Sequence, residues 1–203
     1  VVAGGGMVLA VAAAFLYGFD VSARAEPYLT TNVILLVIAL GLGIGWAWIS
    51  GKRVAMTDMP QMVALYNGMG GGAAAAIAAT ELLSGNALAH GPVVTVLAIL
   101  GGLIGAVALS GSLIAWAKLD GRMNKAWRLP KHQYVNAALL CGALFIGAVV
   151  TVMAVVGAEE TPILLILVFF AVALALGVLL TTPIGGADMP VVISLYNAFT
   201  GLA

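Results

Sequence analysis

Long apolar runs are the feature of this sequence that most restricts its fold. Hydrophobic residues make up 63% of the 203 positions and charged residues only 8%, whereas a soluble domain carries about 25% charged residues. Such a chain cannot cover a water-exposed surface with polar side chains, so the composition predicts an integral membrane protein. The runs are continuous and about twenty residues long, which matches membrane-spanning helices rather than the alternating strands of a membrane barrel. The expected fold class is all-α, a polytopic transmembrane helix bundle.

Seven such runs are separated by polar breaks or by glycine and proline. They cover about residues 1–19, 31–50, 58–83, 92–116, 134–157, 162–180 and 188–203. In the third run, the stretch from Gly70 to Ala76 contains only glycine and alanine. Helices in lipid associate through small residues, so we expect a neighbouring helix to approach this backbone closely.

Basic residues indicate which loops face the cytoplasm, where Lys and Arg are enriched. Under strict alternation of the spans, seven of the eight basic residues fall on one side, namely Lys52, Arg53, Lys118, Arg122, Lys125, Arg128 and Lys131. Only Arg24 falls on the other side, together with the acidic pair Glu159 and Glu160. We therefore assign the basic side to the cytoplasm.

A ten-residue motif occurs twice along the chain. The copies span residues 58–67 and 188–197, and both open with Asp-Met-Pro and close with Leu-Tyr-Asn. Aspartate followed by proline predicts a helix start, with the carboxylate of Asp58 or Asp188 accepting hydrogen bonds from first-turn amides. Each copy then places an asparagine, Asn67 or Asn197, roughly 13 Å further along the helix axis. At that depth the amide lies near the midplane of the hydrocarbon core.

The two asparagines have two interpretations. An amide at mid-depth must find hydrogen-bond partners, and polar residues there often mark an ion or proton pathway. An ordinary hydrogen bond between two helices is the alternative for Asn67 and for Asn197. For Asp58 and Asp188, taken alone, capping of the helix is the simpler interpretation.

Hydroxyl and amide side chains that could line such a pathway are Thr95, Ser110, Ser112, Ser194, Asn67 and Asn197. None of these groups titrates near neutral pH, so a titrating group must come from elsewhere. Glu81, near the outer end of the third run, is one candidate, and an interfacial acid that faces water is its alternative interpretation. We expect His90 to be exposed in an outer loop and His132 to be solvated or interfacial. Cys141 is expected to be a small buried apolar residue without a disulfide partner.

Motifs for nucleotide or metal chemistry do not occur in recognisable form. The glycines from Gly41 to Gly45 lie within an apolar run without a preceding strand, and Gly51-Lys52-Arg53 lacks the spacing of a phosphate loop. His, Cys and acidic residues are not clustered at metal-ligand spacing. We therefore predict no catalytic, cofactor-binding or metal-binding residue on this chain.

Several stretches together carry a resemblance to a known family. They are the two motif copies, the run Gly185 to Val192, which reads Gly-Gly-Ala-Asp-Met-Pro-Val-Val, and the patch from Gly105 through Gly111-Ser112 to Lys118-Leu119. The chain resembles, along its whole length, the membrane part of the beta subunit of proton-translocating NAD(P) transhydrogenase. The resemblance implies a homodimeric enzyme of the bacterial inner membrane, partnered by alpha subunits, that couples proton flow to hydride transfer from NADH to NADP+.

The resemblance also implies how the enzyme is divided into domains. Residues 1–203 would form a transmembrane proton-channel domain and would be a fragment of a longer chain. A soluble NADP(H)-binding domain is expected to follow it, so that NADP(H) and NAD(H) bind to other domains or subunits.

Individual roles follow from the positions that match the family. Asn197 matches a channel asparagine, and we place Ser194, three residues earlier, beside it. Asp188 matches an acid that takes part in coupling at the cytoplasmic end. Asn67 and Asp58 receive the equivalent roles from the internal repeat.

One departure from the family concerns a histidine. Many members carry a membrane-embedded histidine that aligns with about Val94, an apolar residue that cannot relay a proton. His90 lies one turn earlier, in the outer loop. A histidine on a helix of a separate alpha subunit would supply the missing group.

Two other classes of protein share some of these features. An independent secondary transporter can be built from an internal repeat whose copies each carry a polar residue at mid-depth. A non-catalytic membrane scaffold with small-residue helices is the third interpretation. A complete gene that continues into a soluble dinucleotide-binding domain would favour the transhydrogenase.

Overall fold

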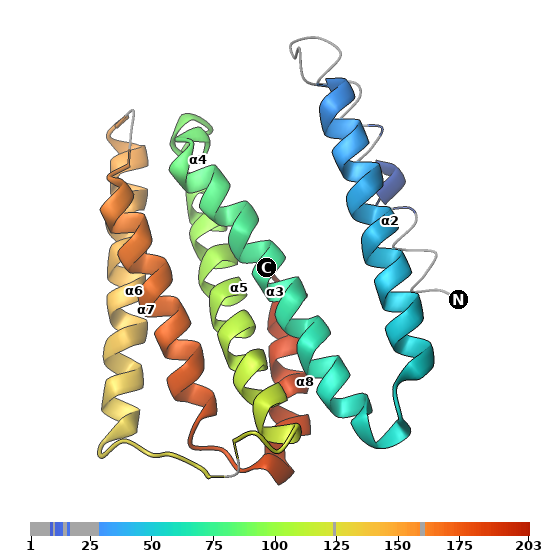
Figure 1. The fold of residues 1–203 in the computed structure, drawn as a ribbon. Helices are drawn as coiled ribbons and strands as arrows, with labels where there is room; N and C mark the ends of the chain where they lie inside the picture. The colour runs from blue at the N-terminus through green and yellow to red at the C-terminus, as the bar shows by residue number, and fades with distance from the viewer. Residues whose placement is uncertain (1–8, 10, 14–15, 17–28, 124, 159–160) are drawn as a thin grey trace. The chain divides into compact units, whose positions relative to one another are not determined.

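The structure is a computed structural model that describes residues 9, 11–13, 16, 29–123, 125–158 and 161–203. Its elements in these ranges are helices and connecting turns, as the composition predicts (Figure 1). The chain divides into two units, Val1–Val54 and Ala55–Ala203, and each is described by itself.

The first unit contains helix α2, Leu29–Arg53. Within this unit its apolar side chains are exposed along nearly the whole helix, as expected of a helix whose partners lie outside the unit. Lys52 and Arg53 occupy its last turn, where basic side chains complement the negative end of the helix dipole. The Nζ of Lys52 lies 4.4 Å from the ring centroid of Trp48. The run predicted at 31–50 is confirmed as this helix, whereas the run at 1–19 lies largely outside the described residues.

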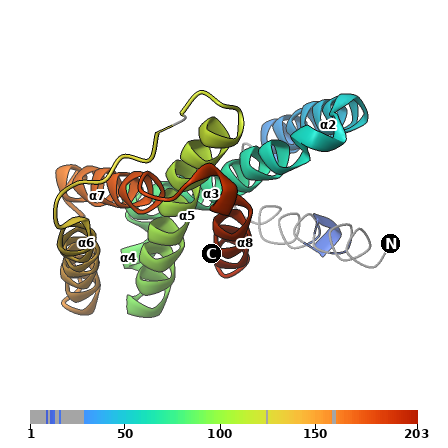
Figure 2. The same ribbon diagram turned by 90° about the horizontal axis from the view of Figure 1, so that it is seen from below.

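The second unit holds the remaining described helices. They are α3 (Met59–Leu83), α4 (Asn86–Ala89), α5 (Pro92–Leu119), α6 (His132–Val155), α7 (Ile163–Thr181) and α8 (Met189–Thr200). Short 3₁₀ turns, Met56–Asp58 and Gly186–Asp188, lead into α3 and α8. Helix α5 is central, because α3, α6, α7 and α8 all pack against it (Figures 1 and 2).

The count of seven membrane spans is not confirmed. Among the described residues, five helices are long and apolar enough to cross a membrane: Thr30–Arg53, Met56–Leu83, Pro92–Leu119, His132–Val155 and Ile163–Thr181. The seventh run forms α8, whose 12 residues extend about 18 Å, less than the hydrocarbon core. The apolar run predicted at 188–203 is thus longer than the helix that it forms.

Small residues bring α3 and α5 into close contact. A Cβ added to Gly105 would lie only 2.6 Å from the carbonyl oxygen of Gly71, and one added to Gly71 would lie 2.9 Å from that of Gly105. The two backbones therefore touch, and any side chain at either position would force the helices apart. The close approach expected at the glycine and alanine stretch is confirmed.

Two groups of buried apolar residues stabilise the second unit. The larger joins α3, α5, α6 and α7 around Leu103, Ile166 and Phe169. The smaller lies where α3, α5 and α8 meet and contains Ala64, Ala115, Met189 and Ile193. This smaller cluster fixes the start of α8 against the end of α5.

The second unit has one end rich in basic residues, which we call the basic end. There α5 and α7 finish while α3, α6 and α8 begin (Figure 1). It carries Lys118, Arg122, Lys125, Arg128 and Lys131. Both motif copies therefore start at the same end of this unit. That this end faces the cytoplasm stays a prediction.

Candidate functional site

The two aspartates of the repeat occupy the predicted N-cap positions of α3 and α8. Asp58 precedes α3 and Asp188 precedes α8, and both are exposed, with Pro60 and Pro190 in the first turns. Neither carboxylate, however, makes the side-chain capping hydrogen bond that we expected. The preceding 3₁₀ turns hold both residues in helical backbone geometry, with φ of −97° and −92°. A capping side chain needs the extended conformation to reach the first-turn amides.

Asn67 is the centre of a buried polar cluster. Its side chain is 8% exposed, its Nδ2–H donates to Ser112 Oγ over 2.9 Å, and its Oδ1 lies 2.8 Å from Thr200 Oγ1. The single proton of the Thr200 hydroxyl is shared between this Oδ1 and the carbonyl of Tyr196. These three residues lie on α3, α5 and α8, so one amide joins three helices. We refer to Asn67, Ser112 and Thr200 as the amide–hydroxyl cluster.

A second polar contact joins α7 and α8. The hydroxyl of Tyr196 lies 2.7 Å from Thr181 Oγ1, and Thr181 donates its own proton to the carbonyl of Gly177 over 2.8 Å. Tyr196 is therefore the donor of the shorter bond. Its ring lies against Gly111 of α5, where an added Cβ would be 2.5 Å from the ring. Glycine at this position thus allows the Tyr196 ring to pack where it does, and alanine would displace it.

The predicted pathway residues of α8 lie apart from the cluster. Asn197 and Ser194 are both exposed, and no side-chain hydrogen bond of either occurs in the part of the chain that the structure describes. Asn67 is thus buried and Asn197 is exposed, although the two occupy equivalent places in the repeat. The cluster partner on α8 is instead Thr200, which the sequence analysis missed. A hydroxyl three residues beyond Asn197 was the available signal.

The other predicted polar residues have local roles. Thr95 is buried and donates to the carbonyl of Ala87 over 2.8 Å, which fixes the short helix α4 against α5. Ser110 is buried and donates to the carbonyl of Ala106 in its own helix over 3.0 Å. Among the predicted hydroxyls in the described part of the chain, Ser112 alone hydrogen-bonds an asparagine of the repeat.

The remaining single residues lie as follows. His90 is exposed, and its Nδ1 lies 2.7 Å from the carbonyl of Asn86. Val94 is exposed in the first turn of α5, while Glu81 and His132 are partly buried. Cys141 is exposed, so the expectation of a buried cysteine is wrong.

The position of Cys141 has a geometric cause. Helix α6 buries Ala143, Gly147 and Val150 against its neighbours. These positions recur at helical spacing, and a residue two places before Ala143 lies about 200° around the axis. Cys141 therefore points away from the bundle.

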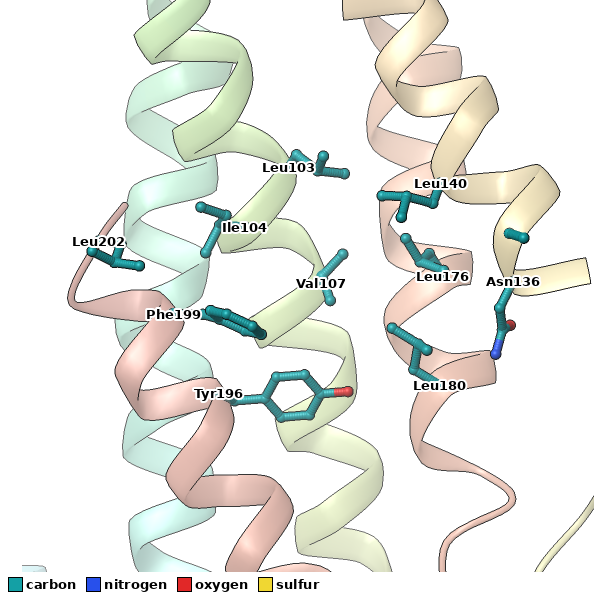
Figure 3. A pocket seen from close by; sticks show the side chains of 11 residues that line it. Leu103, Ile104, Val107, Asn136, Leu140, Leu176, Leu180, Tyr196, Phe199 and Leu202 are labelled. Atoms are coloured by element: carbon teal, nitrogen blue, oxygen red, sulfur yellow. The ribbon is translucent and has the colours of Figure 1, made fainter. Parts of the chain in front are cut away.

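An open apolar groove of about 450 Å³ is lined by residues of α5, α6, α7 and α8 and of the segment after α8. It is lined by Leu103, Ile104, Val107, Asn136, Ala137, Leu140, Leu176, Leu180, Tyr196, Phe199 and Leu202 (Figure 3). The buried Oδ1 of Asn136 has no hydrogen-bond partner. A wall of this composition does not hold water, so the groove is not a polar pathway.

Residues with metal-ligand chemistry do not gather anywhere in the described ranges, where no three His, Cys, Asp or Glu side chains lie close together. The side-chain groups of the buried cluster on α3, α5 and α8 are an amide and two hydroxyls. Such groups both donate and accept hydrogen bonds, so they can hold and reorient water.

Comparison with known proteins places the chain in a family. The family described as NAD(P) transhydrogenase beta subunit matches residues 1–203. NAD(P) transhydrogenase subunit beta of Rhodospirillum rubrum, and the same protein of its strain ATCC 11170, are each 38% identical over 177 residues. That match covers 84% of this chain and 36% of the relatives, so the chain spans about a third of their length. The chain belongs to the NAD(P) transhydrogenase beta subunit family and contains helices of that subunit's membrane part.

Proposed function

We propose that residues 1–203 are the membrane domain of a proton-translocating transhydrogenase. In this proposal the domain conducts protons and couples their movement to hydride transfer from NADH to NADP+ on separate soluble domains. The observation that carries the proposal is the amide–hydroxyl cluster, in which one buried amide joins three helices. Family membership supplies the reaction, because the matched relatives are named as subunits of that enzyme.

The cluster is suited to passing protons rather than storing them. Its amide and hydroxyl groups each donate and accept hydrogen bonds, so a water molecule among them can exchange partners as a proton passes. None of the three groups ionises near neutral pH, so the titrating group has to come from outside the cluster. We propose that a histidine of the alpha subunit supplies it.

The exposed polar residues of α8 indicate where the pathway is completed. Ser194 and Asn197 lie one turn apart on the same face of α8, and both are uncovered in this unit. A polar face at membrane depth needs partners from other helices or from water. We propose that this face lines the channel, with helices of the alpha subunit or of the rest of the beta subunit as the opposite wall.

Coupling is proposed to act through the helix starts at the basic end. Asp188 begins the helix that carries Thr200, and Asp58 begins the helix that carries Asn67. Both carboxylates are exposed, so a soluble NADP(H)-binding domain could contact them. Because a helix moves as a stiff element, a push on either start would displace the cluster.

The proposed assembly follows the family. We propose a homodimer in the bacterial inner membrane, with alpha subunits and a C-terminal NADP(H)-binding domain as partners. An independent transporter is less favoured in its inverted-repeat form, because both motif copies start at the same end of the second unit.

Asn67→Leu in the complete enzyme tests the proposal. The full-length beta subunit with its alpha partner is reconstituted into sealed vesicles, and proton pumping is measured together with hydride transfer. We expect both rates to fall together by about tenfold or more, which corresponds to about 1.4 kcal/mol or more. Asn136→Leu is the matched control, because it makes the same change on a lining residue of the apolar groove. Unchanged pumping by Asn67→Leu would remove the cluster from the mechanism.

A further inference from the structure

Lys118 is a buried lysine with an unusual set of partners. It lies in the last turn of α5 and is only 7% exposed. Its Nζ donates to the carbonyl of Thr181 over 3.0 Å and also to the carbonyls of Thr182 and Ile184. An ammonium group has three protons, so all of its donors are used on one turn of backbone. In the described part of the chain no carboxylate pairs with it.

The charge of Lys118 is compensated by the end of a helix. Thr181 is the last residue of α7 and Thr182 follows it. Their carbonyls belong to the unpaired set at a helix C-terminus, which carries partial negative charge. The lysine therefore acts as a cationic cap that α5 supplies to α7. Removing the ammonium group would take one hydrogen bond from each of these three carbonyls, of which those of Thr181 and Thr182 keep a backbone N–H donor.

A second segment holds the same turn. We call residues 181–185 the α7–α8 turn, which crosses the end of α5 (Figure 2). The backbone N–H of Trp127 donates to the carbonyl of Thr182 over 3.2 Å, and Nε of Arg128 donates to the carbonyl of Pro183 over 3.4 Å. All four carbonyls from 181 to 184 thus accept hydrogen bonds from α5 or from the loop that follows it.

The hydrogen bonds to the α7–α8 turn lie between the two sites that the proposed mechanism couples, the start of α8 and the amide–hydroxyl cluster. The α7–α8 turn leads directly into Gly186–Asp188 and hence to the start of α8. On the other side, Lys118 is six residues beyond Ser112 on the same helix, about 9 Å along the axis. Ser112 accepts the hydrogen bond of Asn67.

We propose that Lys118 is a positioning residue that ties the start of α8 to the amide–hydroxyl cluster. It holds the turn that precedes Asp188 in fixed register with the helix that carries Ser112. A movement imposed at Asp188 then displaces Ser112 instead of being absorbed in the turn. This inference rests on the proposed function, because it assigns a role within that coupling.

The test compares three variants of the full-length enzyme in sealed vesicles. Lys118→Met removes the charge and donors at similar length, Lys118→Arg keeps both, and Lys125→Met is the control at an exposed lysine near the same end. The measured quantity is the number of protons pumped per hydride transferred. For Lys118→Met we expect a loosened turn and a ratio lowered about fivefold while hydride transfer continues. The control keeps the wild-type ratio, and Lys118→Arg recovers most of it.

A second measurement tests whether the α7–α8 turn itself is loosened. Hydrogen exchange of the amides in residues 184–188 should become about tenfold faster in Lys118→Met, as hydrogen bonds to a charged group are lost. If Lys118→Met does not assemble, Lys118→Gln takes its place, with a smaller loss expected. Failure of both neutral variants to assemble would assign Lys118 to folding alone and would overturn the positioning role.

The outcomes separate this inference from the proposed function. A wild-type ratio in Lys118→Met, or a parallel fall of both rates with the ratio unchanged, overturns the positioning role while leaving proton conduction intact. By contrast, absence of pumping in the unmodified enzyme, or full pumping by Asn67→Leu, overturns the proposed function itself.

Discussion

Helices α3 and α8 begin with the same motif but bury different faces of it. In α3 the buried positions are Ala64 and Asn67, whereas Met59 is 43% exposed. In α8 the buried positions are Met189, Ile193 and Tyr196, and Asn197 is exposed. Ile193 and Tyr196 correspond to positions 63 and 66, one residue before the buried pair of α3. The second helix is thus rotated by about 100° relative to the first.

The difference arises in the two contacts with α5. Helix α3 brings its small residues against Gly105, so its backbone touches α5 directly. Helix α8 instead places the Tyr196 ring on Gly111, which leaves its backbone further from α5. A repeated motif therefore determines where a helix begins, while the shape of the partner determines which side is buried. The polar face of α8 is left available for a pathway.

Adding one methyl group to α5 should separate the two contacts most strongly. At Gly105 an added Cβ meets backbone, whereas at Gly111 it meets a side chain that can rotate. We expect Gly105→Ala to destabilise the protein by about 3 kcal/mol and Gly111→Ala by about half as much. The measurement is the thermal unfolding midpoint of the full-length protein in detergent. Gly142→Ala, with open space around the added Cβ, is the control, and equal losses at Gly105 and Gly111 would contradict the comparison.

Removing the acceptor of Asn67 should give the next largest effect. Ser112→Ala leaves the buried Nδ2–H of Asn67 without its partner, which costs about 2 kcal/mol. Ser194→Ala makes the same change on the exposed face of α8 and should stay within about 0.5 kcal/mol. The free energy of unfolding of both variants is measured by denaturation in the same detergent. A Ser194→Ala loss as large as that of Ser112→Ala would mean that α8 is not rotated as described.

The hydroxyl of Tyr196 offers a smaller change on the buried side of α8. Tyr196→Phe removes one hydrogen bond to Thr181 but leaves Thr181 bonded to Gly177. The expected cost is about 1 kcal/mol. Tyr134→Phe, at a tyrosine that is 75% exposed, is the control and should change the unfolding midpoint little. If the two variants behaved alike, the Tyr196 hydroxyl would contribute nothing to the docking of α8.

The features that could be read from the sequence are those set by neighbours along the chain. The starts of α3 and α8 follow from proline in the first turn, and the close approach of Gly71 follows from the absence of side chains around it. Helix lengths follow from the apolar runs, except where the run at 188–203 continues past the described end of α8.

The features that could not be read are set by residues far away in the sequence. The sequence predicts Lys118 among the basic residues of the cytoplasmic side, but its acceptors lie 63 to 66 residues further on. Asn67 and Asn197 both follow Leu-Tyr at the close of the motif, yet one is buried and the other is exposed, because their helices pack differently against α5. No local motif identifies Thr200, because its role depends on an amide 133 residues earlier.

The aspartates give the smallest expected change in stability and the sharpest functional contrast between the two copies. Because neither carboxylate makes a capping hydrogen bond, Asp58→Asn and Asp188→Asn should each cost less than about 0.5 kcal/mol, the contribution of the helix dipole at an exposed site. Function should respond differently. Asp188 starts the helix whose exposed polar face is proposed to line the channel, so Asp188→Asn should weaken the response to NADP(H) binding more than it weakens proton uptake.

Proton uptake is measured in the complete enzyme with and without NADP(H), for Asp188→Asn and for the matched variant Asp58→Asn. Asp58 starts a helix whose backbone is already fixed against Gly105, so a change there should be transmitted less. A larger loss in Asp58→Asn than in Asp188→Asn would reverse this order and place the coupling movement in α3. Wild-type responses in both variants would remove the two acids from coupling, and, since neither makes a capping bond, would leave them only their interaction with the helix dipole.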